Sequence, residues 1–263
     1  MVWKGVLRNW DSYRKPMRLF SPNVVAHLGW SGVAGSARNE PGQVDINIQG
    51  TVDLARVALE AGARRWIGLG SQAEYGPSAK PLDEQAPTHP TTLYGAAKLS
   101  CSHLTRTICQ QAGVQHAWIR VFSLYGPRDN PDWLIPFVIR KLLAGESPKL
   151  TSGSQLWDYL YIDDAAQAVA KMILSQVEGV YNLGSGYPLP IRSFVEQVRD
   201  LIDPEFQLNF GEMPFRPDQV MFLSAKTDAI SSALNWRPST GIPEGLKRTV
   251  DWFKNMESSK HKG

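Results

Sequence analysis

A tyrosine and a lysine four residues apart, Tyr94 and Lys98, with Ser71 upstream of them, are the residues of this sequence best suited to chemistry. The ordinary pKa of a phenol is about 10, so a free tyrosine is a poor acid or base at neutral pH. In a helix, Lys98 would lie one turn from Tyr94 on the same face, and its charge would favour the phenolate and lower the pKa of Tyr94. The hydroxyl of Ser71 could polarise a substrate oxygen that gains or loses the proton. Because a Tyr and a Lys at this spacing also occur together on surface helices, the rest of the sequence has to decide between the two interpretations.

The composition is that of an ordinary globular protein of 263 residues, 43% of them apolar and 20% charged. A chain of this length can form one large domain or two small ones. The formal net charge of +3 is too small to indicate nucleic acid or a membrane as a partner, and no apolar run approaches the length of a membrane span. The cysteines Cys101 and Cys109 fall on one expected helix, where a separation of ~12 Å excludes a disulfide between them. The sequence therefore predicts a cytoplasmic protein, and no metal site is expected.

Short apolar runs alternate with helical patterns over the first half of the chain. This alternation favours parallel βαβ units with helices on both faces of one sheet. Beyond residue 128 the sequence contains more proline and glycine and shorter elements, and we expect a smaller, substrate-covering region there. The expected strands are residues 23–28, 65–69 and 115–122, and the expected helices are residues 43–61, 92–111 and 133–144.

Nine short segments resemble, in the same order, the motifs of the extended short-chain dehydrogenase/reductases, the nucleotide-sugar epimerase and dehydratase group. Each motif is weak alone, but their shared order over nearly the whole chain makes the resemblance specific. It implies an α/β fold with a doubly wound, Rossmann-like parallel sheet and a smaller C-terminal substrate-binding region. The segments are Val25 to Trp30, Asn47 to Thr51, Ser71 to Gly76, Tyr94 to Lys98, Arg120 to Pro127, Asp158 to Asp164, Tyr181 to Gly186, Arg216-Pro217-Asp218 and Leu234 to Pro238.

The resemblance also implies roles for individual residues. Ser71, Tyr94 and Lys98 match the catalytic set, in which Tyr94 takes a proton from a sugar hydroxyl while hydride passes to NAD or NADP. Lys98 would in addition hold the nicotinamide ribose. The positions that match cofactor-binding residues are Leu28, Gly29, Trp30, Asn47, Tyr94, Lys98 and Val121, and those that match substrate-binding residues are Gln72, Ser123 and Arg216.

Three positions on the substrate side depart from the family pattern. Gln72-Ala73 stands where the 4,6-dehydratases carry Asp-Glu, and since removal of water from the sugar needs a carboxylate acid or base, dehydration is disfavoured. Ser123 replaces an asparagine that often holds a substrate phosphate, and Trp157 replaces an arginine that could bind the diphosphate. Arg216 could still make a bidentate phosphate contact, or it could be a surface arginine. The expected activity is therefore that of an epimerase or 4-ketoreductase of nucleotide-diphosphate sugars.

The largest departure from the family pattern is at the N-terminus of the chain. The family opens with a strand, a Gly-x-x-Gly-x-x-Gly turn and a helix whose N-terminus holds the cofactor diphosphate. Here only 22 residues precede the first clear strand. Gly29, Gly32 and Gly35 repeat the glycine spacing, but Pro41 follows closely and prevents a long helix from opening at them. We therefore expect an N-terminally truncated fold whose first strand is an open edge, and impaired binding of NAD or NADP.

The expected division places an incomplete dinucleotide-binding domain in residues 1–127. Residues 128–263 would form mainly the substrate-binding region, with segments near 155–185 returning to the Rossmann-like sheet. Small and apolar residues on the helices at 43–61 and 92–111 could pack across a twofold axis, and the family resemblance implies a homodimer with a four-helix interface. The alternative to an active enzyme is a non-catalytic remnant or binding domain of the same family. The nucleotide, the sugar, the reacting carbon and the choice between NAD and NADP stay open.

Overall fold

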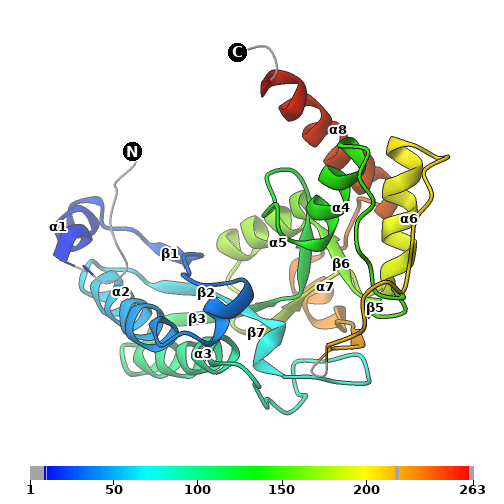
Figure 1. Cartoon of the computed structure of the whole chain (residues 1–263). Helices are drawn as coiled ribbons and strands as arrows, with labels where there is room; N and C mark the ends of the chain where they lie inside the picture. Colours follow the sequence, from blue (N-terminus) through cyan, green and yellow to red (C-terminus); the bar gives the residue numbers. More distant parts are fainter. Residues whose placement is uncertain (1–8, 10, 217–218, 261–263) are drawn as a thin grey trace.

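A four-stranded parallel sheet lies at the centre of the computed structural model, which describes residue 9, residues 11–216 and residues 219–260 (Figure 1). In the sheet the strands follow the order β1, β2, β3, β7, that is Val24–His27, Arg65–Ser71, Gln115–Val121 and Gly179–Leu183. The register pairs Ser71 with Val121, so both residues stand at the C-terminal edge of the sheet. Ligands of open parallel sheets bind at this edge.

Helices cover both faces of this sheet, as expected for strands that are apolar along most of their length. On one face, α2 (Gln49–Glu60) and α3 (Leu93–Gln111) form a core with Trp66. On the other face, α5 (Ile162–Leu174) and α7 (Asp228–Leu234) pack against Ile67. Trp66 and Ile67 serve opposite faces because successive side chains of a strand alternate. The doubly wound α/β class predicted from the sequence is confirmed.

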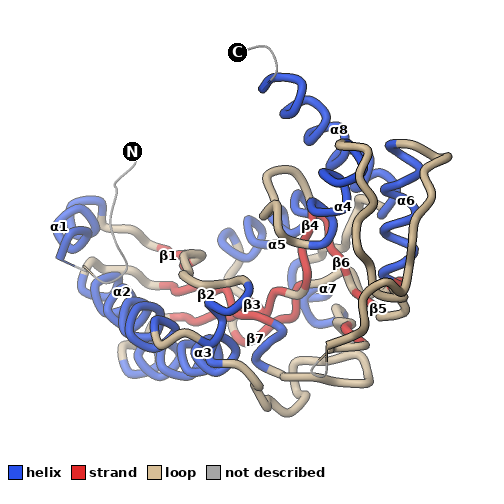
Figure 2. Tube along the Cα trace, viewed as in Figure 1, coloured by secondary structure: helices blue, strands red, loops and turns tan. Residues whose placement is uncertain are grey.

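A second part of the molecule is built around three further helices, which share one apolar core. Figure 2 shows these helices on the side of the sheet opposite to α2 and α3. Two small sheets accompany them, one of two strands in parallel and one of three short strands. The helices are α4 (Leu134–Leu143), α6 (Ile191–Ile202) and α8 (Ile242–Lys260). The two-stranded sheet consists of β4 (Ser123–Tyr125) and β6 (Tyr159–Tyr161), and the other of β8 (Leu189–Pro190), β5 (Leu156–Trp157) and β9 (Phe222–Leu223).

The segment between β1 and β2 differs most from the sequence expectation. The helix expected over residues 43–61 begins as a π-helix, η2 (Gln43–Ile48), and only then continues as α2. A short 3-10 helix, η1 (Gly35–Asn39), precedes it, and another, η3 (Gln72–Glu74), follows β2. The π-helix has a physical cause: its two buried residues, Gln43 and Asn47, use their amides to bind the loop in front of it.

The N-terminal helix α1 (Asp11–Phe20) lies against α2, where Arg18 pairs with Glu60. Cys101 and Cys109 are both free and buried on α3, as the helical spacing predicts. Within residues 11–216 and 219–260, no helix has the length and apolar character needed to cross a membrane.

Two glycines in β2 make room for the indole of Trp118 on the neighbouring strand. Trp118 on β3 is fully buried and lies across Gly68 and Gly70. A Cβ atom on Gly68 would stand 2.2 Å from the indole ring, and one on Gly70 would stand 2.2 Å from Trp118 Nε1. Because neither glycine has a side chain, the indole of Trp118 can pack directly against the backbone of β2.

We predict that Gly68→Ala destabilises the protein by about 1–3 kcal/mol, because the buried indole cannot move away without disturbing the core. Urea unfolding followed by circular dichroism measures the change. Gly241→Ala is the matched control, since a Cβ there meets only Pro243 at an ordinary 3.9 Å. Equal stability of the two variants would contradict the proposed packing.

Candidate functional site

Ser71 and Tyr94 meet at the C-terminal edge of the sheet. Ser71 is the last residue of β2, and Tyr94 lies in the first turn of α3. The helix can start this close to η3 because Gly95 has no side chain: a Cβ there would lie 2.4 Å from the carbonyl oxygen of Ala73. Burial raises the pKa of Tyr94, and the Ser71 hydroxyl close to the phenol works in the opposite direction. The structure thus brings these two predicted catalytic residues together.

Lys98 lies one turn further along α3 and is almost completely buried, with 5% of its surface exposed. Its ammonium donates to the carbonyl oxygen of Leu69 at 2.7 Å and lies 3.8 Å from the centre of the Trp30 ring. The distance from Nζ to the centre of the Tyr94 ring is 5.9 Å. Burial lowers the pKa of Lys98 from 10.5 to about 8, and the charge of Glu74 limits this decrease.

Trp30 and Asn47, two of the predicted cofactor-binding residues, belong to a hydrogen-bonded loop after β1. Asn47 accepts from the backbone N–H of Ser31 and donates to its carbonyl oxygen, both at 2.9 Å. Gln43 accepts from the indole N–H of Trp30 at 3.0 Å and donates to the carbonyl oxygens of Gly32 and Ala37. The two amides therefore fix the shape of the loop.

The other predicted cofactor-binding positions lie at the same edge of the sheet. Leu28 and Gly29 are exposed directly after β1, and Val121 lines a cavity next to Ser71. Their assignment to the cofactor stays a prediction.

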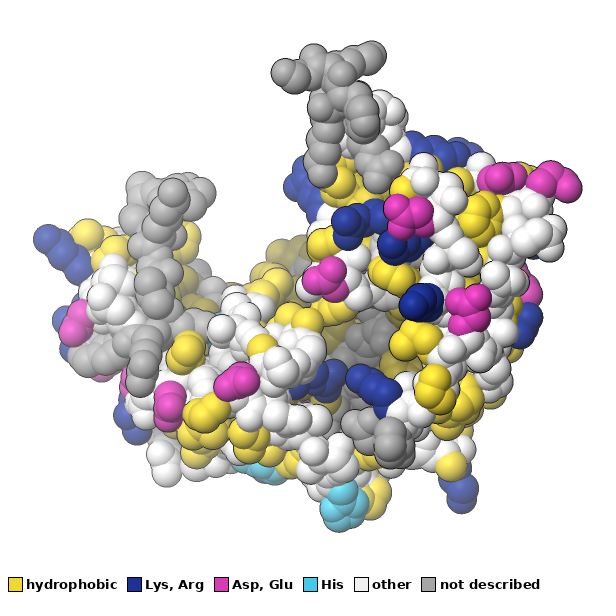
Figure 3. Space-filling view, in the orientation of Figure 1, with side chains coloured by type: hydrophobic (Ala, Val, Ile, Leu, Met, Phe, Trp, Pro, Cys, Tyr) yellow, Lys and Arg dark blue, Asp and Glu magenta, His cyan; other side chains and the backbone are white. Residues whose placement is uncertain are grey.

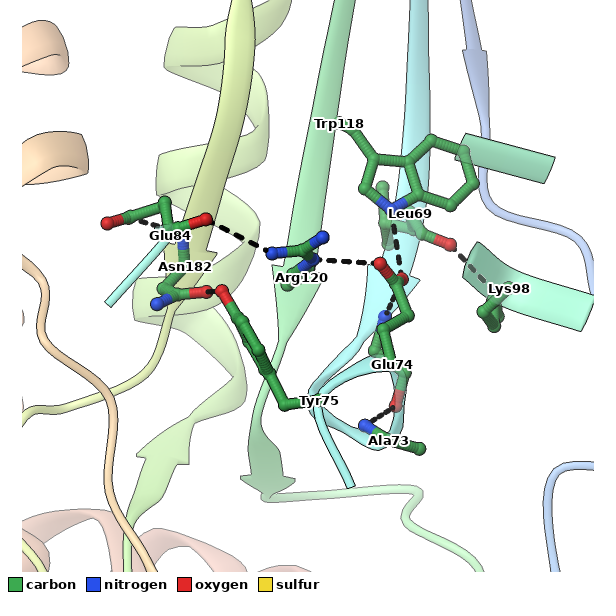
Figure 4. Close-up of polar contacts among 10 residues, drawn as sticks. Leu69, Ala73, Glu74, Tyr75, Glu84, Lys98, Trp118, Arg120 and Asn182 are labelled. Carbon is green, nitrogen blue, oxygen red and sulfur yellow. Dashed lines mark hydrogen bonds and ion pairs between the residues drawn. The ribbon is translucent and has the colours of Figure 1, made fainter. Parts of the chain in front are cut away.

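Sequence reasoning missed a buried polar network around Glu74, whose side chains Figure 4 draws. Glu74 is fully buried and accepts three hydrogen bonds: from the backbone N–H of Ser71 at 2.9 Å, from Trp118 Nε1 at 2.9 Å and from Arg120 Nε at 2.8 Å. Arg120 also lies over the ring of Tyr75, 4.4 Å from its centre. The signal in the sequence was a glutamate and an arginine within otherwise apolar strand-end segments, but nothing in it paired the two.

The site opens into a cavity of about 680 Å³ between the sheet and the second part of the molecule. Figure 3 shows the molecule hollowed here, with Lys and Arg side chains at the floor of the hollow. Ser71, Tyr94 and all three predicted substrate-binding residues line this cavity. Those three are Gln72, Ser123 and Arg216; Pro217 and Asp218 of the same motif lie outside the described residues.

Ser123 and Trp157, two of the three departures on the substrate side, are hydrogen-bonded to each other. The indole N–H of Trp157 donates to the Ser123 hydroxyl at 2.7 Å, and both residues line the cavity. The Ser123 hydroxyl can still donate its own proton to a ligand, whereas the Trp157 ring adds a flat apolar surface to the cavity. A carboxylate, Asp129, also lines the cavity, and burial raises its pKa to about 6.

The described residues fit the nicotinamide end of NAD or NADP better than the diphosphate end. Ser71, Tyr94 and Lys98 supply two hydroxyls and an ammonium with N–H groups left to donate. A diphosphate needs backbone N–H groups at a helix N-terminus approached through glycines. No long helix opens at the glycine run: η1 begins at Gly35 and has five residues, and a Cβ on Gly32 would stand 2.7 Å from Gln43 Nε2. Gly32 therefore makes room for the Gln43 amide in this loop.

Comparison with known proteins finds one matching family model and several relatives. The model of the NAD dependent epimerase/dehydratase family matches residues 2–184. A UDP-glucuronate 4-epimerase from Thermodesulfobacterium geofontis is 29% identical over 256 residues, which are 95% of this chain and 79% of the relative. A putative UDP-glucose 4-epimerase from Methanocaldococcus jannaschii is 29% identical over 243 residues, covering 88% of this chain and 77% of the relative.

Two solved structures share the fold. The UDP-glucose 4-epimerase of Thermotoga maritima with UDP-glucose superposes with a TM-score of 0.90 at 22% identity, covering 97% of this chain and 84% of that one. The Thermus thermophilus UDP-glucose 4-epimerase in complex with NAD gives a TM-score of 0.84 at 24% identity, covering 95% and 83%. At these identities the likeness concerns the fold alone.

We predict that Lys98 makes the protein more stable as the pH rises. Between about pH 8 and the ordinary lysine pKa of 10.5, the unfolded chain binds the proton of Lys98 more tightly than the folded chain does, so stability increases with pH across this window. The gain is at most ~3 kcal/mol. Urea unfolding at both ends of the window should show it in the wild type and not in Lys98→Met. Lys254→Met is the control, because Lys254 also donates to a backbone carbonyl but is only partly buried. A pH dependence that survives in Lys98→Met would contradict the assignment.

Proposed function

The chain belongs to the NAD-dependent epimerase/dehydratase family, and we propose that it acts as an epimerase or 4-ketoreductase of nucleotide-diphosphate sugars. The observation that carries the proposal is the placement of Ser71 and Tyr94 together in the wall of a cavity large enough for a small ligand. Relatives whose names state UDP-sugar epimerases support the substrate class.

In the proposed reaction, Tyr94 exchanges a proton with an oxygen of the sugar. Because burial raises its pKa, the phenol is protonated at neutral pH and can donate its proton to a keto oxygen. The reverse transfer takes the proton from a sugar hydroxyl. Ser71 binds the same oxygen, and its geometry is fixed by the bond from its backbone N–H to Glu74. A bound nicotinamide cofactor supplies reversible acceptance of hydride.

The cavity lining favours epimerisation or reduction over dehydration. Gln72 follows Ser71 where elimination of water would need a carboxylate. Lys149 and Arg216 line the cavity too and are suited to the charge of a diphosphate. A homodimer formed through the outer faces of η2–α2 and α3 remains our prediction.

A binding role without catalysis is the second candidate. It is favoured by the glycine run after β1, at which the described part of the chain places no long helix for a diphosphate. Nuclear magnetic resonance of a panel of UDP- and dTDP-sugars incubated with the protein and NAD distinguishes the two. Appearance of the C4 epimer, or oxidation of NADPH by a 4-keto sugar nucleotide, supports the enzyme.

We predict that Tyr94→Phe lowers kcat by roughly 10²–10⁴-fold with little change in KM, because the proton donor is lost while the ring stays in place. Tyr187→Phe is the matched control, since Tyr187 is exposed and lies outside the cavity lining. A Tyr94→Phe variant with wild-type kcat would sink the proposed mechanism.

We predict also that this chain binds NAD no more tightly than it binds nicotinamide mononucleotide, with a dissociation constant weaker than about 1 mM for both. The reason is that Ser71, Tyr94 and Lys98 suit the nicotinamide end of NAD. Among the described residues, no long helix begins at Gly29, Gly32 and Gly35 to bind the diphosphate. Isothermal titration measures both ligands. Low micromolar binding of NAD, far tighter than that of the mononucleotide, would make the glycine run a diphosphate site.

A further inference from the structure

The indole of Trp157 is held in the cavity wall by three kinds of contact. Its backbone lies in the middle strand of the three-stranded sheet, where Trp157 pairs with Leu189 on one side and Leu223 on the other. Its ring N–H donates to the Ser123 hydroxyl at 2.7 Å. The partly buried ring also packs against two apolar cores. Trp157 therefore offers the cavity a rigid aromatic surface.

The residue after Trp157 anchors this strand to the interior. Asp158 is fully buried, and its carboxylate accepts from the backbone N–H groups of Ser185, Gly186 and Ala225 at 2.7, 3.0 and 2.9 Å. These bonds tie β5 to the chain that follows β7 and to the chain that follows β9. A side chain fixed in this way loses little conformational freedom when a ligand stacks on it.

Gln155, two residues before Trp157, lines the same cavity and is only 6% exposed. Its Nε2 donates to the Thr151 hydroxyl at 3.3 Å, whereas its Oε1 is buried without a hydrogen-bond partner among the described residues. An amide oxygen accepts only from an O–H or N–H group. The diphosphate of a sugar nucleotide offers no such donor, but each sugar hydroxyl does. Gln155 therefore suits a ligand that carries hydroxyl groups.

The position of Trp157 along the wall indicates which part of a sugar nucleotide would reach it. Ser71 pairs with Val121, and Ser123 follows Val121 by two residues, a length of about 7 Å in an extended chain. Because the Trp157 indole is bonded to Ser123, it lies within the reach of a sugar ring bound at Ser71. The base of a sugar nucleotide is separated from the sugar by two phosphates and a ribose. A sugar that reacts at Ser71 and Tyr94 therefore brings its own ring to Trp157.

We propose that Trp157 is a specificity-determining residue whose indole stacks on the C–H face of the hexose of a nucleotide-diphosphate sugar. The inference rests on the proposed function and names the part of the substrate that this wall binds. The C–H groups of a sugar ring carry a slight positive charge, which suits the negative face of an aromatic ring. The indole stands where the family pattern has an arginine, so the diphosphate is left to Lys149 and Arg216, which line the same cavity.

The test compares the affinities of UDP and UDP-galactose, measured by isothermal titration without cofactor. The ratio of the two dissociation constants isolates the contribution of the hexose. Trp157→Ala should weaken the binding of UDP-galactose by roughly 3–10-fold and leave that of UDP unchanged. Trp157→Phe should retain most of the wild-type ratio, because the aromatic face stays in place.

A second variant and a control complete the test. Trp157→Arg restores the cation of the family pattern and should favour UDP over UDP-galactose, since a guanidinium binds phosphate. This variant carries the test should the alanine variant fail to fold. Trp133→Ala is the matched control and should leave the ratio unchanged: Trp133 also lines the cavity, but it is 39% exposed and precedes α4.

Two results overturn the inference. Equal weakening of UDP and UDP-galactose by Trp157→Ala would place the base or the phosphates at the indole. Unchanged affinities for both ligands in folded Trp157→Ala and Trp157→Arg would show that the indole does not contact the ligand. Because the titration needs no turnover, it stands apart from the activity assay: the expected change of the ratio without any sugar reaction refutes the proposed function alone.

Discussion

The buried carboxylate of Glu74 is the interaction on which the site depends. A charge without solvent is costly unless it is paired and hydrogen-bonded, and Glu74 meets this requirement with three donors from two strands. Arg120 neutralises the carboxylate, and the indole N–H of Trp118 and the backbone N–H of Ser71 donate the other two hydrogen bonds. A Cβ at Gly70 would stand 2.3 Å from Glu74 Oε1, so the same glycine that admits Trp118 also admits the carboxylate. The backbone of Ser71 is therefore held by an ion pair in the interior of the sheet.

Much of the fold followed from local patterns in the sequence. The apolar runs at β2 and β3 and the spacing in α3 are features of consecutive residues, and they indicated a parallel sheet with Tyr94 and Lys98 on one helix. The contacts that were missed join residues far apart in the sequence. Glu74 and Arg120 are 46 residues apart, and Ser123 and Trp157 are 34 apart. The loop after β1 was missed for a different reason: it is shaped by the amides of Gln43 and Asn47, which follow no periodic pattern.

Likeness of fold and likeness of the cavity lining are separate properties of this molecule. The TM-score of 0.90 against a protein of 22% identity covers 97% of this chain, so the likeness of fold includes both the sheet and the second part of the molecule. The cavity lining, in contrast, departs from the family pattern at Gln72, Ser123 and Trp157. The bond between Ser123 and Trp157 joins two of these departures, so a substitution at either position removes the hydrogen-bond partner of the other.

The two side chains proposed to act on the sugar oxygen, Ser71 and Tyr94, come from β2 and α3, whereas much of the wall that faces them comes from segments after β3. The two sets of residues sit on different helices and different apolar cores. Changes in one set are therefore felt little by the other, since distant substitutions without shared partners act nearly additively. This division favours evolutionary change, because residues of the cavity wall after β3 can be substituted to accept a new sugar while the proton-transfer groups stay the same. It also marks α4, α6 and the strands around Trp157 as the place where directed evolution would alter selectivity at the smallest risk to turnover.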